Sequence, residues 1–276
     1  MNTPTMPLLT VCGIEGVFTD GKGAGPQSCD VACAKLFCKV GGKLAVFSTR
    51  APAAVQQIVG RDVVSLPAVT CGGALLYDLN RDCMVQARPI SVQAGRTILD
   101  FVLSELPRTG VVGVSDRAAT CMLASSSEAQ ALLDREGGAY QMIPPEDAGR
   151  SWCKLSICGP QDEVDRMKTY LSIHHELPVN VLRQDDNTVE LVTAQVQPGE
   201  GLRTLCRLAG CMEQQAAAVI AEPDELSWAD GAGELVVMGD AAESLRSHAS
   251  EVLESRCQGG LGQYLYCRAA LKQGDL

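Results

Sequence analysis

The chain has 276 residues, 46% of them hydrophobic and 20% charged, which is typical of a globular protein with one large domain or two unequal ones. Its formal net charge of −10 argues against nucleic-acid binding, which depends on lysine and arginine contacts to phosphate. No apolar stretch approaches the ~20 residues that span a bilayer, and no secretory segment precedes the chain. The sequence therefore predicts a cytoplasmic protein that binds neither nucleic acid nor membranes.

Strands and helices alternate over the first third of the chain. Buried strands are expected at residues 8–14, 43–49 and 68–78, the last broken by a glycine pair, and helices at 28–42 and 51–60. Buried strands joined through helices imply a parallel sheet that is covered on both faces.

From about Asp82 the pattern changes to one of mixed helices and strands. Helices are expected at 95–106, 126–138 and 160–173, and strands at 110–115, 152–158 and 179–183. The strand–helix alternation resumes with strands at 189–194, 216–221 and 234–239 and a helix at 199–210. The sequence thus predicts an α/β core, residues 1–82 and 190–276, interrupted by a compact α+β insert, residues 83–189.

Thirteen cysteines lie largely within apolar runs such as "DVACAKLFCKV" and "WCKLSIC". Their number is odd and no C-x-x-C spacing occurs, so buried free thiols in a reducing compartment are expected. The histidines, His174, His175 and His248, do not stand at ligand spacing from a cysteine pair, which argues against a zinc site.

Five segments occur in an order and spacing that point to one family: "GIEGVFT", "LAVFSTRAP", "CGGALLYD", "VELVTAQVQPGEGL" and "VVMGDAAESL". Over essentially its whole length the chain resembles the haloacid dehalogenase (HAD) superfamily, specifically the Cof-type phosphatases with an α+β (type IIB) cap. The resemblance implies a Rossmann-like core with a parallel sheet and an inserted cap domain. It also implies Mg²⁺-dependent hydrolysis of small phosphate esters, such as sugar or cofactor phosphates, through a phospho-aspartate.

That reaction needs a carboxylate to attack phosphorus and a second acid, two residues later, to protonate the leaving oxygen. The resemblance places these roles at Gly13 and Glu15, so the nucleophile position has no side chain. Two interpretations of Glu15 stay open. It is a solvated loop acid, or it serves as an unusual catalytic group.

The family's motif with a phosphoryl-binding hydroxyl matches Ser48, Thr49 and Arg50. The Asn-Gly pair that supports the site in the family is replaced by Gly72 and Gly73. The hydroxyl therefore survives while the amide side chain is lost. Ser48 has an alternative role as the cap of the helix that follows it.

The family's lysine position falls on Pro198, which carries no charge. An ungapped alignment then places the metal-binding segment on "IAEPDEL", with Ala221 in place of the first metal carboxylate, followed by Asp224 and Glu225. Both of these acids lie beside a proline and are expected to face water. In the alternative alignment Asp240 is a surviving metal ligand.

Three central roles are therefore unfilled, and we expect a catalytically inactive or severely impaired relative in which Mg²⁺ is absent or weakly bound. Turn N–H groups from Gly13 to Gly16 and the helix start after Ser48 are expected to hold an anion, such as a phosphorylated metabolite, in the core–cap cleft. Arg183 is a further candidate ligand contact, and a protein partner is the other possible occupant. An active Mg²⁺-dependent phosphatase that uses non-standard residues remains the alternative, and the sequence does not define the oligomeric state.

Overall fold

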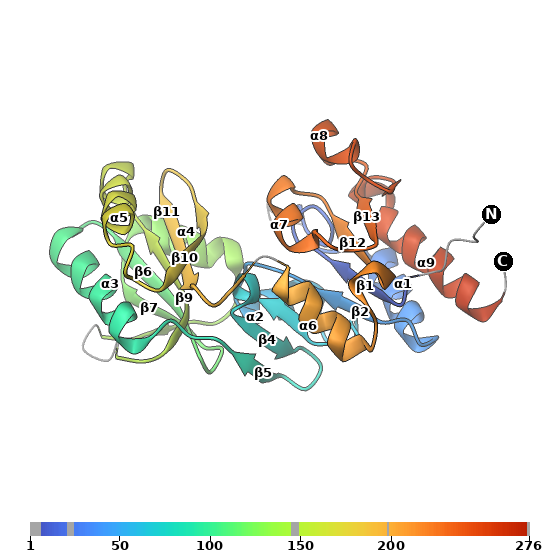
Figure 1. Cartoon of the computed structure of the whole chain (residues 1–276), viewed down its shortest axis with the longest axis horizontal. Helices are drawn as coiled ribbons and strands as arrows, with labels where there is room; N and C mark the ends of the chain where they lie inside the picture. The colour runs from blue at the N-terminus through green and yellow to red at the C-terminus, as the bar shows by residue number, and fades with distance from the viewer. Residues whose placement is uncertain (1–6, 21–24, 145–148, 198, 275–276) are drawn as a thin grey trace.

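The computed structural model describes residues 7–20, 25–144, 149–197 and 199–274. In Figure 1 the chain forms two bodies side by side, one built from both ends of the chain and one from its middle. We call the first body the core and the second the cap. The insertion of a mixed helix-and-strand body into an α/β core agrees with the fold class predicted from the sequence.

The core is organised around a five-stranded sheet in the order β14-β13-β12-β1-β2, in which every described pair of neighbours is parallel. The strands are β1 (Leu9–Cys12), β2 (Leu44–Val46), β12 (Ala216–Ile220), β13 (Glu234–Val237) and β14 (Glu251–Val252). Every residue of β1, β2 and β12 is buried, because both faces of the sheet are covered. Burial on both faces explains why the sequences of these strands are continuous apolar runs.

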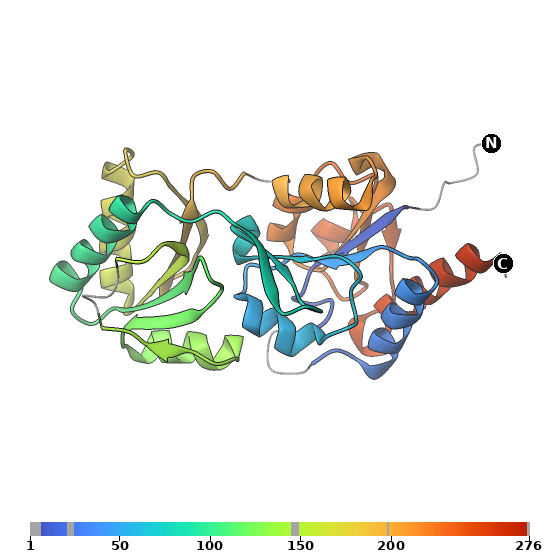
Figure 2. The same cartoon turned by 90° about the horizontal axis from the view of Figure 1, so that it is seen from below.

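Helices cover both faces of the core sheet, as Figure 2 shows. On one face α1 (Ser28–Lys39), α2 (Pro52–Val59) and α9 (Gly260–Gln273) pack over a cluster that includes Phe18 and Phe37. On the other face α6 (Glu200–Ala209) and α7 (Leu226–Ala229) enclose a cluster that includes Phe47 and Trp228. The short helix α8 (Glu243–Arg246) follows β13.

A small antiparallel sheet extends the core toward the cap. It consists of β3 (Ala68–Thr70), β4 (Leu75–Asp78) and β5 (Cys83–Ala87). Since β5 pairs with β4, the change of pattern near Asp82 marks the turn between these two strands, and the chain enters the cap after β5. The chain also returns from the cap to the core later than residue 189, because the whole of β11 (Thr188–Thr193) lies in the cap sheet.

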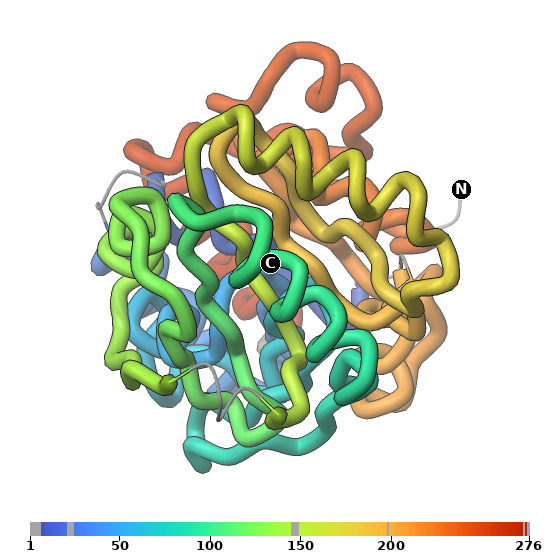
Figure 3. The backbone as a smooth tube through the Cα atoms, turned by 90° about the vertical axis from the view of Figure 1, so that its left-hand side faces the viewer, coloured from blue at the N-terminus to red at the C-terminus, as the bar shows by residue number. Residues whose placement is uncertain are grey.

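The cap contains a six-stranded sheet in the order β10-β11-β9-β6-β7-β8. Its other strands are β6 (Gly110–Ser115), β7 (Thr120–Ala124), β8 (Gln141–Met142), β9 (Trp152–Cys158) and β10 (Val179–Gln184). Helices α3 (Val92–Glu105) and α5 (Gln161–Ile173) cover one face, and in the end-on view of Figure 3 they lie in front of the sheet. Helix α4 (Ser127–Glu136) packs on the opposite face against Val112 of β6, Met122 of β7 and Cys158 of β9.

Core and cap meet through a buried apolar cluster. Ala51, Cys71 and Ala74 on the core side pack with Val114, Cys153 and Val192 on the cap side. All thirteen cysteines are free, and six of them are buried, although four are exposed, so the expectation of buried thiols holds for only part of the set. No helix of the described residues is long and apolar enough to cross a membrane.

Candidate functional site

The candidate site is a cleft of about 970 Å³ between the core and the cap. Its core wall is made by the loops that follow β1, β2 and β12, and its cap wall by β10 and the end of α4. The carboxyl ends of parallel strands are where α/β proteins generally bind ligands, and a cleft of this volume suits a small molecule.

Gly13 directly follows β1 and is buried, and its N–H donates to the carbonyl oxygen of Val219 at 2.9 Å. A Cβ atom at this position would lie 1.8 Å from Oε1 of Glu225 and 2.6 Å from its carboxylate carbon. No real Cβ tolerates such a contact. The carboxylate of Glu225 therefore occupies the space that a side chain at position 13 would need.

Glu225 is held in this place by the backbone of its own turn. Its Oε2 accepts hydrogen bonds from the N–H groups of Ala221 at 2.9 Å and Glu222 at 3.1 Å. Burial, which outweighs these hydrogen bonds, raises the pKa of Glu225 to about 8, with Asp224 and Glu222 adding to the effect. The expectation that Glu225 faces water is wrong for its carboxylate, because the missing side chain of Gly13 leaves room for it.

Ala221 follows β12 and closes the other side of the same loop. A Cβ atom on Gly16, where φ is +69°, would lie 2.5 Å from the methyl group of Ala221. Gly16 is thus required both by its left-handed backbone and by the close approach of Ala221. Its N–H donates to the carbonyl oxygen of Thr19 at 2.7 Å, and the N–H of Gly13 is also engaged. These two turn N–H groups, expected to hold an anion, already have backbone partners.

The residues at these positions do not fit the Mg²⁺ ion that the fold implies. Mg²⁺ prefers several oxygen ligands in octahedral geometry. Gly13 and Ala221 offer no side-chain oxygen, and one oxygen of Glu225 is taken by two backbone donors. Within residues 7–20, 25–144, 149–197 and 199–274, no group of three or more histidine, cysteine or acidic side chains is arranged to hold a metal.

The loop after β2 keeps its polar side chains, but they bind protein groups. Oγ of Ser48 accepts from the N–H of Arg50 at 3.0 Å and so fixes the turn, whereas the helix cap of α2 is Ala51. The guanidinium of Arg50 is buried and pairs through Nε with Glu15 at 2.5 Å. Its Nη1 donates to the carbonyl oxygen of Arg135, at the end of α4 in the cap, at 3.0 Å.

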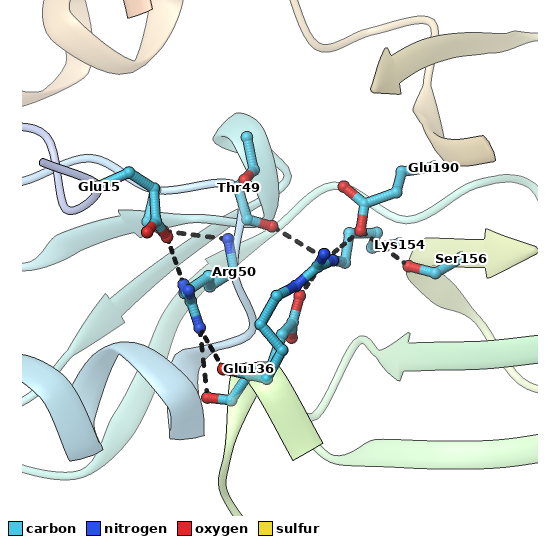
Figure 4. A network of polar contacts seen from close by, with 9 residues as sticks. Glu15, Thr49, Arg50, Glu136, Lys154, Ser156 and Glu190 are labelled. Carbon is cyan, nitrogen blue, oxygen red and sulfur yellow. Dashed lines mark hydrogen bonds and ion pairs between the residues drawn. The ribbon is translucent and has the colours of Figure 1, made fainter. Parts of the chain in front are cut away.

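Figure 4 shows that this loop joins a second network centred on Lys154 of β9. Nζ of Lys154 donates to the carbonyl oxygen of Thr49 at 3.0 Å and pairs with Glu136 at 3.2 Å and Glu190 at 3.1 Å. Burial lowers the pKa of Lys154, but the two carboxylates outweigh it and raise the pKa above its ordinary value. The charged lysine thus ties the core loop to the cap.

Gly72 and Gly73 shape the cleft through their backbone. Gly72, where φ is +63°, donates its N–H to the carbonyl oxygen of Ser48 at 3.0 Å, and a Cβ there would lie 2.3 Å from Leu182 of the cap. Gly73, where φ is +112°, lies close to Val196. The lost amide side chain has therefore left room for a tight contact between core and cap.

The remaining predicted residues lie at different places. Arg183 lines the cleft from β10 and pairs with Asp185 at 3.6 Å, and Asp224 lines the core wall beside Glu225. Asp240 does not line the cleft; its carboxylate accepts a hydrogen bond at 3.4 Å from the N–H of Arg256. Pro198 lies outside the described residues.

Sequence reasoning missed the buried network of Lys154, Glu136 and Glu190. A signal was present, because Lys154 interrupts the apolar run "WCKLSIC" and Glu190 interrupts "VELVT". A charged residue in the middle of a strand that is otherwise buried requires a partner of opposite charge.

A parallel α/β core with a cap domain over its strand ends is the architecture that the sequence resemblance implied. A family profile described as haloacid dehalogenase-like hydrolase matches residues 26–265. The chain therefore belongs to the haloacid dehalogenase-like hydrolase family, as the ordered motifs indicated.

Solved structures share this fold at low sequence identity. A haloacid dehalogenase-like hydrolase from Bacteroides thetaiotaomicron is 16% identical, with a TM-score of 0.81 over 93% of this chain and 97% of that one. A Thermotoga maritima protein is also 16% identical, with a TM-score of 0.79 over 94% and 97%. A sugar phosphatase of HAD subclass IIB is 12% identical, with a TM-score of 0.71 over 97% and 99%. The search of curated protein sequences gives no match.

Proposed function

We propose that this chain is a non-catalytic member of its family that binds a small molecule in the core–cap cleft without transferring a phosphoryl group. The observation that carries the proposal is the position of Glu225, whose carboxylate fills the space of the missing side chain at Gly13. The adjacent positions add support, since Ala221 has no metal-binding oxygen and Arg50 is engaged by Glu15 and by the cap.

The cleft itself supports the ligand-binding part of the proposal. It keeps about 970 Å³ of space, although its loops no longer carry the family's reactive groups. The apolar junction and the buried Lys154 hold its two walls together. A pocket of this size between two packed walls is suited to binding. A phosphorylated metabolite was the ligand expected from the sequence, and it remains one candidate occupant.

A phosphatase assay tests the loss of catalysis. The purified chain is incubated with excess Mg²⁺ and a panel of sugar and cofactor phosphates, and released phosphate is measured. We expect no release above that of the protein-free control. A member of the HAD subclass IIB sugar phosphatases, assayed in parallel, confirms that the panel and the metal are adequate.

One observation favours a second candidate function, that of an active phosphatase with an unusual nucleophile. Oε1 of Glu225 lies 1.8 Å from the position of a Cβ on residue 13, and Glu15 is two residues further along the chain. In this mechanism the ionised carboxylate of Glu225 attacks phosphorus through Oε1, the ester P–O bond breaks, and the departing oxygen takes a proton from water. A second water then hydrolyses the phospho-glutamate to phosphate and free Glu225. Against it, the raised pKa of Glu225, about 8, keeps most of the carboxyl protonated at neutral pH and weakens it as a nucleophile.

Two variants separate these functions. Phosphate release that disappears in Glu225→Gln, or a covalent phosphoryl adduct found on Glu225 by mass spectrometry, establishes the enzyme and refutes the non-catalytic proposal. Release that disappears only in Glu15→Gln assigns the nucleophile to Glu15 and also refutes it. If neither the parent chain nor either variant releases phosphate above the protein-free control, the result supports the non-catalytic proposal.

A further inference from the structure

The cleft is strongly acidic. Within the part of the chain that the structure describes, eight acidic side chains line it against three basic ones. The core wall carries Glu15, Glu222, Asp224 and Glu225, and the described partners of these four carboxylates include one basic side chain, Arg50, which pairs with Glu15. Charge of one sign focused in a cleft attracts ligands of the opposite sign.

The carboxylates on the core wall crowd one another. Burial raises the pKa of Glu222, and the neighbouring Asp224 and Glu15 raise it further. Glu225 adds a carboxylate that is largely enclosed. Among the described residues no donor reaches its Oε1, since both of its hydrogen bonds go to Oε2. Because the carboxyl of Glu225 is mostly protonated at neutral pH and Glu15 is paired with Arg50, Glu222 and Asp224 are the acids on this wall with no basic partner among the described contacts.

The basic groups around the cleft are largely committed to protein partners. Arg50 contacts Glu15 and the end of α4, and Arg183 lies 3.6 Å from Asp185. Behind the cap wall, Lys154 is shared between Glu136 and Glu190. The third lining arginine, Arg135, is exposed. A phosphate ester entering this cleft would meet more carboxylates than available cations.

We propose that the ligand of this cleft is a small organic cation, a molecule with one or more amino groups that face Glu222 and Asp224. This inference rests on the proposed ligand-binding function and names the chemical class of its ligand. An ammonium group donates three hydrogen bonds and needs no octahedral cage, so it suits scattered carboxylates better than Mg²⁺ does.

The apolar part of the cleft fits the rest of such a molecule. Trp228 and Phe47 both line it and stack on each other with ring centroids 4.8 Å apart. An alkyl or ring portion of the ligand packs on the part of this apolar surface that lines the cleft. The volume of about 970 Å³ admits a polyamine or an amino sugar.

Isothermal titration calorimetry with four probes tests the proposal. Putrescine and spermidine serve as cations, and inorganic phosphate and glucose 6-phosphate as anions, at low ionic strength and again at about 0.3 M salt. The cleft variant Glu222→Gln/Asp224→Asn is compared with Asp100→Asn/Asp134→Asn, which removes the same two charges from exposed positions on α3 and α4. We expect saturable amine binding that is weakened at least about tenfold in the cleft variant and less than about twofold in the control.

Equal weakening in the two double variants would show that amines bind the acidic surface without using the cleft, which overturns the proposal. So would saturable binding of phosphate or glucose 6-phosphate with none of the amines, or binding of no probe. Catalysis is measured separately in the phosphatase assay. Phosphate release refutes the non-catalytic function. If no phosphate is released but the cleft binds anions and no amines, only the proposal of a cationic ligand is refuted.

Discussion

The two loops on the core wall of the cleft differ in an instructive way. After β1 the carboxylate of Glu225 fills the space beside Gly13, the position to which the sequence resemblance assigns the family's nucleophile. After β2 the family's residue types Ser48, Thr49 and Arg50 are kept, yet they bind backbone and cap groups. A position without a side chain is thus filled by a neighbour, and side chains that match a family motif are bound to protein groups. The partners of a residue decide its role more than its identity does.

The largest expected effect concerns the loop after β2, which is tied to the cap by Lys154. Replacing Lys154 with methionine leaves Glu136 and Glu190 buried without their cation. We expect a loss of stability of about 3–5 kcal/mol, the usual cost of breaking a buried ion pair from one side. Thermal unfolding measures it, since 1 kcal/mol shifts the Tm of a chain this size by about 2–4 °C.

Lys168→Met is the matched control. Lys168 pairs with Asp165 at 3.1 Å on the outer surface of α5, and the change should cost no more than about 0.5 kcal/mol. Equal shifts in Tm for the two variants would contradict a special role for the buried network, and with it the contrast between the two loops.

An intermediate effect is expected at the loop after β1. Gly13→Asp introduces a Cβ within 1.8 Å of Oε1 of Glu225, and overpacking of this kind costs about 1–3 kcal/mol. Adding Glu225→Ala to Gly13→Asp removes the clash, so the double variant should regain at least half of the lost stability. Thermal unfolding of the two single variants and the double variant measures these changes in stability as a double-mutant cycle.

Gly25→Asp is the control for introducing an aspartate, because a Cβ at Gly25 meets nothing within 4 Å. Its Tm should stay close to that of the parent chain. If Gly13→Asp alone is as stable as the parent, or if Glu225→Ala does not rescue it, then the two residues do not compete for one space.

The smallest expected effect is a pH dependence carried by Glu225. Its pKa is raised to about 8 in the folded chain, so between its ordinary value and pH 8 the folded state binds the proton more tightly than the unfolded state does. The wild-type chain therefore loses stability as pH rises through this range. Glu225→Gln removes this loss, so its Tm advantage over wild type should grow from about pH 5 to pH 8 and then level off.

We expect this growth to amount to about 1–2 kcal/mol, less than a full burial penalty, because the residue as a whole is only half-buried and water screens its charge. Glu243→Gln, on the exposed helix α8, should show a difference that does not vary with pH. A constant difference for Glu225→Gln as well would show that its carboxylate titrates normally in the folded chain.

The fold was largely predictable because its elements carry local signals. The apolar runs of β1 and β12 and the glycine that ends α6 mark elements that the structure confirms. Helix α9 was missed because Gly260 and Gly262 lie in its first turn, where glycine is a poor helix former. Strand β5 was missed because every residue from Cys83 to Gln86 is exposed, so no apolar alternation marks it.

The site was predictable only in part. The assignment of the family's nucleophile and metal positions to Gly13 and Ala221 rests on the order of the motifs in the sequence and stays a prediction. The inward turn of Glu225 depends on contact between loops more than 200 residues apart in the sequence, and no local pattern encodes it. The pairing of Lys154 with the core loop has the same origin, because the cap brings it there through tertiary packing.

The mutual fit of Gly13 and Glu225 also limits the evolutionary paths open to this chain. An aspartate that reappears at position 13 meets the glutamate already in place, and its benefit depends on a second substitution arriving first. While Glu225 holds this place, an aspartate at position 13 fits only after the neighbouring loop gives up the space.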